Sequence, residues 1–150
     1  MNNHFVMSFE VPGKPFGKQR PRMMRTGHAY TPKETINYEN LVRMCFKEKY
    51  PMHIPIEGTV GMRVDAYFPV AESWSKKKKK QALDGEIHPH KPDWDNIGKI
   101  ISDALNEIAY KDDSQIADAH VTKRYSERPR VEVRLYYFAD DDLHLEELPF

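Results

Sequence analysis

The chain has 150 residues, a length that fits one domain with a substantial buried core. Charged residues make up 31% of the sequence, yet the formal net charge is zero, and the single cysteine, Cys45, excludes an intrachain disulfide. No stretch approaches the roughly 20 apolar residues of a transmembrane helix, and no apolar signal segment precedes the first charged residues. We therefore expect a protein of the reducing cytoplasm.

The neutral net charge conceals an asymmetry between the two ends of the chain. Residues 140–150 contain five acids and no Lys or Arg, a charge of −5, which leaves +5 on residues 1–139. A basic body with an acidic end indicates a polyanionic partner. We divide the chain into a domain at 1–139 and an acidic C-terminal tail at 140–150, which we expect to be flexible.

The first half of the chain predicts a strand, a helix and a second strand. Apolar residues alternate over 5–9, which predicts a strand that ends by Pro12. The sequence Thr31-Pro-Lys-Glu34 is typical of a capping box with proline at the first helical position, and it opens a helix that runs to about Tyr50. Strict alternation over 60–68 then predicts the clearest strand of the chain.

The second half predicts two helices and two strands. A short helix should include residues 76–80, with Ser73 or Ser75 as its cap and Gly85 as its stop. An amphipathic helix should begin at Asp95 or Asn96 as N-cap and end near residue 110. Alternation predicts strands at 115–123 and 131–137, separated by a turn. This order predicts a single α+β domain, in which helices pack on a mixed or mostly antiparallel sheet of about four strands.

Two segments are strongly basic. Residues 13–25 carry five cations and no acid, and their glycines and prolines predict an extended loop or hairpin. This segment either binds phosphate through bidentate arginine contacts or is a solvated basic loop. Residues 76–80 are five consecutive lysines, which form either a mobile, solvated charge run or a lid that faces phosphate. The candidate DNA-binding residues are Lys14, Lys18, Arg20, Arg22, Arg25, Lys76, Lys77, Lys78, Lys79, Lys80 and Lys91.

The densest group of chemically useful residues surrounds the last predicted helix. The sequence Lys91-Pro-Asp93-Trp-Asp95-Asn-Ile-Gly-Lys99 opens this helix, and Asp112-Asp113 follows it. Carboxylates are the ligands that Mg²⁺ and Mn²⁺ prefer, and a loop Asp-x-Asp presents two of them to one point, which Asp113 would complete from the far end of the helix. Lys99 would lean back toward Asp95 and suit a phosphate clamp or a leaving-group role in phosphodiester hydrolysis. The alternative is that Asp95 only caps a helix and that the other acids lie on the surface.

These residues resemble the core of the RusA family of Holliday junction resolvases, which are phage and prophage endodeoxyribonucleases of bacteria. The resemblance covers most of residues 5–138, and it rests on 91–99, Asp103-Ala-Leu, 112–116 and the N-terminal Gly-Lys-Pro-Phe-Gly-Lys-Gln-Arg-Pro-Arg. It implies a homodimer, in the cytoplasm and nucleoid of a bacterial host, that resolves four-way DNA junctions in recombination and repair by paired symmetric nicks. The implied cofactor is Mg²⁺, for which Mn²⁺ substitutes. By position, the resemblance implies Asp93, Asp95 and Asp113 as metal ligands with Asp112 as an adjacent acid, and Asp93, Asp95, Lys99 and Asp113 as the catalytic residues.

The last residues of the tail resemble a different recognition element. Leu148, Pro149 and Phe150 follow acids, as in the C-terminal tip of bacterial single-stranded-DNA-binding proteins. We expect the tail to dock a protein that binds such tips, to fold back on the basic face as an autoinhibitor, or to act only as a solubilising tail. Two other functions stay open for the whole chain. One is a non-catalytic, structure-selective DNA-binding protein of phage recombination, and the other is a metal phosphoesterase that acts on small phosphomonoesters.

Overall fold

The computed structural model describes residues 4–138, so the predicted tail, with Leu148, Pro149 and Phe150, lies outside the described residues. Within 4–138 we find no helix with the length and apolar character needed to cross a membrane. The elements are, in chain order, β1 (His4–Pro12), β2 (Arg22–Met23), β3 (Ala29–Tyr30), α1 (Lys33–Lys49), β4 (Val60–Phe68), α2 (Lys76–Leu83), α3 (Trp94–Ala104), the 3-10 turn η1 (Asp113–Gln115), β5 (Ile116–Tyr125) and β6 (Arg130–Phe138).

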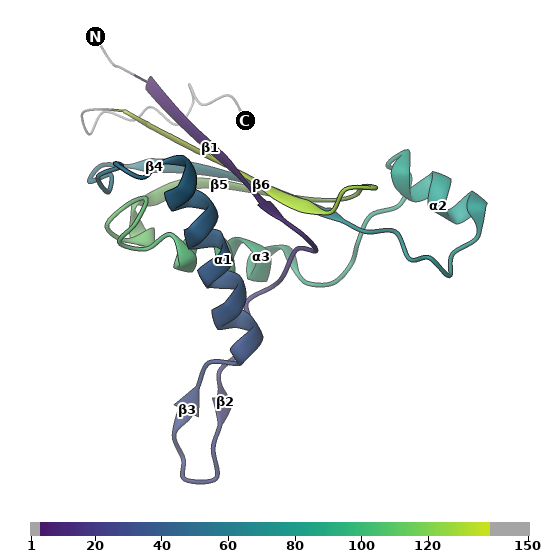
Figure 1. Cartoon of the computed structure of the whole chain (residues 1–150), viewed down its shortest axis with the longest axis horizontal. Helices are drawn as coiled ribbons and strands as arrows, with labels where there is room; N and C mark the ends of the chain where they lie inside the picture. The colour runs from purple at the N-terminus through teal and green to yellow at the C-terminus, as the bar shows by residue number, and fades with distance from the viewer. Residues whose placement is uncertain (1–3, 139–150) are drawn as a thin grey trace.

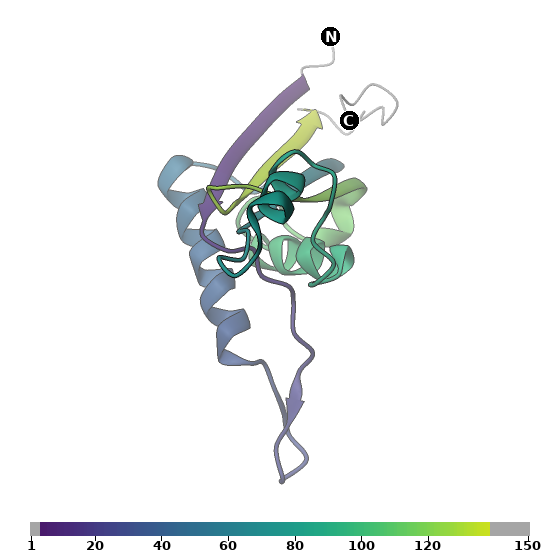
Figure 2. The ribbon, with the colours of Figure 1, turned by 90° about the vertical axis from the view of Figure 1, so that its right-hand side faces the viewer.

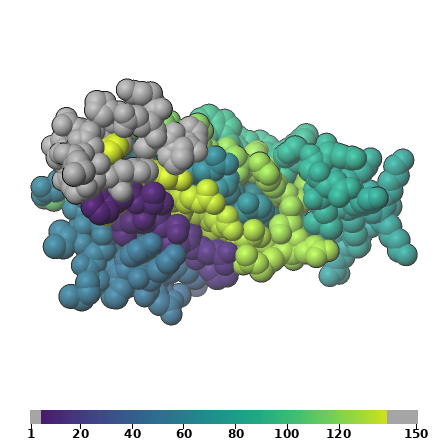
Figure 3. Space-filling model, turned by 90° about the horizontal axis from the view of Figure 1, so that it is seen from above, coloured from purple at the N-terminus to yellow at the C-terminus, as the bar shows by residue number. Residues whose placement is uncertain are grey.

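A four-stranded mixed sheet organises the domain, in the order β1-β6-β4-β5. β6 pairs antiparallel with both β1 and β4, whereas β4 and β5 run parallel. Helices α1 and α3 lie on one face of this sheet, and α2 stands away from it on an arm between β4 and α3 (Figure 1). Figure 3 looks onto the opposite face, where β1 and β6 lie at the surface. The predicted α+β class and the sheet of about four strands are confirmed.

The hydrophobic core lies between the sheet and the two helices. Strand β4, from Val60 to Phe68, is buried along most of its length, and only Arg63 and Tyr67 are partly exposed. From the helix side, α3 buries Ile97, Ile100 and Ile101 completely. Burial of each such side chain stabilises the fold by about 1.5–3 kcal/mol. The 3.6-residue period of α3 therefore fixes which side of this helix faces the core and which side faces solvent.

Two helix boundaries differ from the sequence prediction. Pro32, with extended backbone, is the N-cap of α1 and no side chain caps it, so the capping box predicted from Thr31 is wrong. Helix α3 ends at Ala104 rather than near residue 110. The apolar pattern continues past Ala104 because Leu105, Ala109 and Tyr110 stay buried in the turns that follow. By contrast, α2 begins and stops as predicted, since Ser75 accepts a hydrogen bond from the Lys78 N–H and Gly85 has a φ of +81°.

The basic segment that follows β1 is extended, as predicted, and it ends in the hairpin of β2 and β3. This hairpin projects beyond the N-terminal end of α1, away from the sheet (Figures 1 and 2). The backbone N–H of Lys18 donates to the Asn96 carbonyl at 2.8 Å, and the Cα of Gly17 lies so close to Pro92 that an added Cβ would be 2.6 Å from the Pro92 Cβ. The segment therefore crosses the start of α3 before it reaches the hairpin.

Candidate active site

The Asp-x-Asp pair stands at the N-terminal entrance of α3. Asp93, not Asp95 or Asn96, is the N-cap residue, and Asp95 lies in the first turn of the helix. The Asp93 carboxylate does not cap the helix, because it accepts a hydrogen bond from the Lys91 ammonium at 3.1 Å instead. Both carboxylates are exposed at a helix end where unpaired backbone N–H groups favour negative charge. The entrance is thus open to a bound cation or to a phosphate held by one.

Lys99 lies one turn further along the exposed side of α3. Its ammonium is 3.8 Å from the Asp103 carboxylate, four residues ahead, so it leans toward the end of the helix rather than back toward Asp95. Asp95, Lys99 and Asp103 follow one another at intervals of four residues, which places them in one row along the helix. The ammonium is well exposed and stays available to a ligand.

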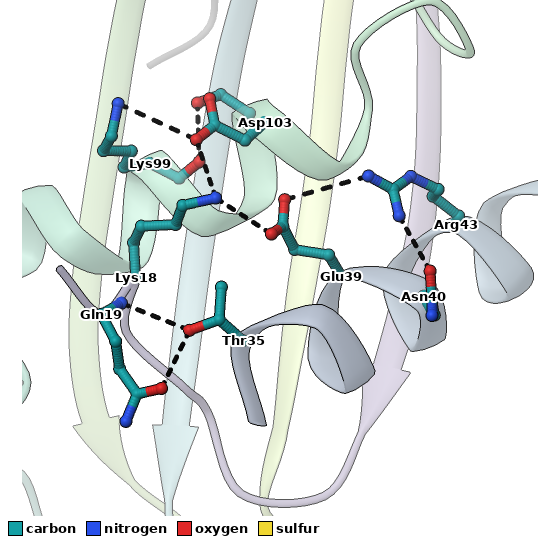
Figure 4. Close-up of polar contacts among 9 residues, drawn as sticks. Lys18, Gln19, Thr35, Glu39, Asn40, Arg43, Lys99 and Asp103 are labelled. Carbon is teal, nitrogen blue, oxygen red and sulfur yellow. Dashed lines mark hydrogen bonds and ion pairs between the residues drawn. The ribbon is translucent and has the colours of Figure 1, made fainter. Parts of the chain in front are cut away.

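Asp103 is also part of a charged network between α1 and α3 (Figure 4). The Lys18 ammonium lies between two carboxylates, 2.9 Å from Glu39 on α1 and 3.2 Å from Asp103 on α3. Burial opposes the charge of Lys18, but the hydrogen bonds to Glu39 and Asp103 outweigh it and raise the pKa of Lys18. Its side chain is only 20% exposed and its charge is matched inside the protein, which favours a structural role, and the DNA-binding role of Lys18 stays a prediction.

Asp112 and Asp113 differ sharply in their surroundings. Asp112 caps η1 by accepting a hydrogen bond from the Ser114 N–H at 3.1 Å, and this bond holds the pKa of Asp112 below its usual range. The Asp113 backbone N–H donates to the Asn106 side chain at 2.8 Å. Burial raises the pKa of the Asp113 carboxyl, and so do a hydrogen bond with Asp103 and the negative charge of that residue. Asp113 therefore lies beside Asp103, at the far end of α3.

The predicted metal ligands are thus distributed over both ends of α3. Asp95 and Asp103 are eight residues apart, which separates their Cα atoms by about 12 Å along the helix axis. Within residues 4–138, no three His, Cys, Asp or Glu side chains lie close enough together to hold a metal ion. Mg²⁺ usually takes one or two protein carboxylates and completes its shell with water and substrate phosphate, so the pair at the entrance suits it chemically. The complete set of Asp93, Asp95 and Asp113 stays a prediction.

The other candidate DNA-binding residues fall in two places. Lys76–Lys80 form most of α2, where the Lys78 ammonium is 4.2 Å from the centroid of the Trp74 ring. Lys14 and Lys91 line a cavity of about 340 Å³ between the base of this arm and the ends of β4 and β5. The remaining cations, Arg20, Arg22 and Arg25, are exposed on the hairpin and the segment that leads to it. These two basic regions lie on either side of the α3 entrance.

Asp103 and Glu39 are the site residues that sequence reasoning did not assign. Asp103 has a visible signal, since it continues the four-residue spacing of Asp95 and Lys99. Glu39 has no such signal in the sequence, because it lies on α1 and is linked to Asp103 of α3 through the Lys18 ammonium. Asp103 links the helix row both to Lys18 and to Asp113.

Comparisons with known proteins agree with this reading of the residues. A family model described as endodeoxyribonuclease RusA matches residues 12–136. The chain is also 42% identical over 135 residues to a Bacillus subtilis (strain 168) protein whose name is given as uncharacterized protein YqaN, a match that covers 86% of this chain and 94% of that one. The family match includes β2, β3, α1, α2 and α3 and the acids of the candidate site. The chain therefore belongs to the RusA family of endodeoxyribonucleases.

Proposed function

We propose that this chain is a magnesium-dependent endonuclease that resolves four-way DNA junctions as a homodimer, by paired and symmetric nicks. Its family is one of endodeoxyribonucleases. The observation that carries the proposal is the row of Asp95, Lys99 and Asp103 on the exposed side of α3, with Asp93 before it and Asp113 beside its end. The acids suit a divalent cation, and the basic segments on either side of them suit the backbone of DNA.

The charges suggest a separate role for each residue of the row and for Asp93, which precedes it. Asp93 and Asp95 would hold Mg²⁺, and Mn²⁺ in its place, at the α3 entrance. When bound, such an ion supplies positive charge to a scissile phosphate. Lys99 carries a second positive charge, and its pairing with Asp103 orients the ammonium along the helix while leaving most of it exposed. Its role in the proposal is to bind a phosphate oxygen as negative charge develops there.

Of the two acids after α3, Asp113 is the better candidate for the site. One oxygen of Asp112 is occupied by the Ser114 N–H, and Asp112 and Gln115 together form the capping box that fixes η1. Asp113 makes no such cap and instead lies close enough to Asp103 for that residue to raise the pKa of its carboxyl. We therefore assign Asp112 to the local fold and retain Asp113 as a proposed ligand.

The dimer follows from the symmetry of the substrate. A four-way junction has approximate two-fold symmetry, and its resolution needs two matched cuts. An isologous dimer supplies two α3 sites related by the same kind of operator. Light scattering coupled to size-exclusion chromatography should give about twice the mass of the chain, and a monomer at the concentrations used for cleavage would contradict this part of the proposal.

The test is cleavage of a synthetic four-way junction beside a linear duplex of the same sequence, with and without Mg²⁺. We expect cuts at symmetric positions in the junction only, and only with the ion. Asp95→Asn should lose cleavage and keep junction binding, because it removes a charge at the α3 entrance and leaves the basic regions intact. Glu48→Gln, which removes an exposed acid on α1, is the matched control and should cut like the wild type.

Two results would overturn the proposal. Equal cutting of junction and duplex would indicate a nuclease that is not selective for branched DNA. Tight junction binding without cleavage in either Mg²⁺ or Mn²⁺ would favour a non-catalytic, structure-selective DNA-binding protein. The latter alternative has one observation in its favour, the separation of the acids along α3 within a single chain.

A further inference from the structure

The hairpin of β2 and β3 is built as a short, well-defined projection. Arg22 pairs with Tyr30, and Met23 pairs with Ala29. The Met24 N–H donates to the His28 carbonyl at 2.8 Å, and the Gly27 N–H donates to the Met24 carbonyl at 3.0 Å. Gly27 has a φ of +87°, which is the conformation that closes a three-residue hairpin loop after a tight turn. The tip is therefore ordered by its own backbone.

The tip of this projection exposes apolar side chains. Met23, Met24 and Tyr30 are 68%, 52% and 45% exposed, and together they line a hollow of about 460 Å³. Apolar side chains gathered on one exposed feature usually mark a site of interaction. The two methionines are unbranched and flexible, so they adapt to an irregular partner surface.

The charge around this apolar tip is positive throughout. Residues 11–33 contain six Lys or Arg residues and no acid. Arg20, Arg22 and Arg25 are exposed on the hairpin and its base. A second copy of the same hairpin would bring like charges together, and the cores of protein interfaces are depleted of charge. A nucleic acid matches both features, because its backbone binds the arginines and its base faces bind the apolar side chains.

We propose that the β2–β3 hairpin is a wedge that inserts Met23 and Met24 at the branch point of a DNA junction and holds the arms apart. Methionine is one of the side chains that proteins insert between base steps. In a continuous duplex such insertion must break a base step inside one helix, whereas at a branch point it has to separate only the stacking of one arm on the next, which costs less. The wedge therefore favours branched over linear DNA. This inference rests on the proposed function for its substrate, and it adds the part of the protein that recognises the branch.

The test is binding of a four-way junction that carries 2-aminopurine at the branch point, in buffer without divalent metal so that cleavage does not contribute. The wild type should raise the 2-aminopurine fluorescence, because unstacking relieves its quenching. The double variant M23A/M24A should lose most of this rise and bind the junction roughly ten-fold more weakly, with unchanged affinity for a linear duplex. The variant M23L/M24L keeps apolar side chains of similar size and should retain the rise.

The matched control is M44A/M52A, which removes two methionines that are also exposed but lie outside the hairpin. It should behave like the wild type. An unchanged fluorescence rise in M23A/M24A, or no rise in the wild type, would overturn the wedge. A change of oligomeric state in M23A/M24A would assign the apolar tip to contact between copies of the chain and would also overturn it. If the wild type raises the fluorescence but does not cut the junction in Mg²⁺, the proposed nuclease activity is wrong and the proposed wedge is retained.

Discussion

Lys18 and Arg22 lie four residues apart in the same acid-free segment, yet they end in opposite situations. Lys18 is half-buried between α1 and α3, where Glu39 and Asp103 match its charge. Arg22 is exposed on the hairpin, and within residues 4–138 no ion pair joins it to an acid. Two cations that look alike in the sequence therefore have different surroundings, one paired between two helices and one exposed to solvent.

The same contrast separates two regions of the molecule, the helices α1 and α3 on one side and the β2–β3 hairpin on the other. On α3 and α1, charges are paired with one another on a helix that packs on the core. On the hairpin, charges of one sign surround exposed apolar side chains. We infer that chemistry belongs to the first region and recognition of the branch to the second, and each prediction below tests this separation.

The largest effect should come from Lys99. Lys99→Gln removes the positive charge proposed to stabilise the phosphate, so single-turnover cleavage of the junction should fall by about 100- to 1,000-fold. Junction affinity should change by less than about two-fold, since one exposed charge on α3 contributes little to binding. Lys47→Gln, on the exposed side of α1, is the control and should cut normally. If affinity and cleavage fell together, Lys99 would contribute to DNA binding as well as to catalysis, and the proposed separation of the two regions would be wrong.

The second effect concerns stability rather than activity. Lys18→Met leaves the buried Glu39 carboxylate without its closest cation, which should lower the free energy of unfolding by about 1.5–3 kcal/mol. Urea denaturation measures this loss. Lys14→Met removes an exposed lysine of the same segment and should cost less than about 0.5 kcal/mol. If Lys18→Met keeps full stability but weakens DNA binding, the original sequence prediction for Lys18 is right and the structural role is wrong.

Most of the fold was predictable because it depends on local patterns. The alternation of β4 and the cap and stop of α2 are written in adjacent residues. The end of α3 was not predictable, because Glu107 takes a φ of +66°, a conformation that the sequence normally marks with Gly or Asn. The Tyr110 hydroxyl instead donates back to the Ser102 carbonyl at 2.6 Å, a contact that only the folded chain reveals.

The site was predictable only in part, for a similar reason. Asp93, Asp95 and Lys99 stand in one short run, so their shared helix end could be read directly. The pairing of Lys18 with Glu39 joins residues 21 positions apart on different elements, and nothing in their spacing indicates it. Likewise, the position of Asp113 beside Asp103 depends on how the turns after α3 fold back.

The third effect should appear in the salt dependence of binding. Replacing Arg20, Arg22 and Arg25 by Gln removes three exposed cations, so the slope of log affinity against log salt should become shallower by about 2.7. At the high-salt end of the range junction affinity should fall by roughly ten-fold, about 1.4 kcal/mol, and by more at lower salt, with cleavage of bound junction unchanged. Fluorescence anisotropy between 50 and 200 mM salt, about the range over which such slopes are measured, gives both quantities. An unchanged slope would mean that these arginines do not contact phosphate.

The smallest effect concerns the face of the sheet opposite α1 and α3. It tests whether paired charges stabilise that face as well. Asp65 on β4 is buried, and its carboxylate accepts hydrogen bonds from the Thr122 hydroxyl and from Arg63, with Arg134 nearby. Burial disfavours the charged form, but these hydrogen bonds and positive charges outweigh it and hold the pKa of Asp65 below its usual range. The lowered pKa means that the charged carboxylate stabilises the fold at neutral pH, and that this contribution declines as the pH falls below about 3.8.

Asp65→Asn should therefore cost about 1 kcal/mol in the free energy of unfolding at pH 7, and the difference from the wild type should shrink toward pH 3. Urea titrations across this pH range measure it, with Glu72→Gln as the control for an exposed acid. The hairpin variants R20Q, R22Q and R25Q should follow the wild-type stability curve, because their charges are not paired within the domain. A penalty for Asp65→Asn that stays constant with pH would show that neutral hydrogen bonds hold this position. In that case, the stabilising ion pairs that set the domain apart from the hairpin would be those around α3.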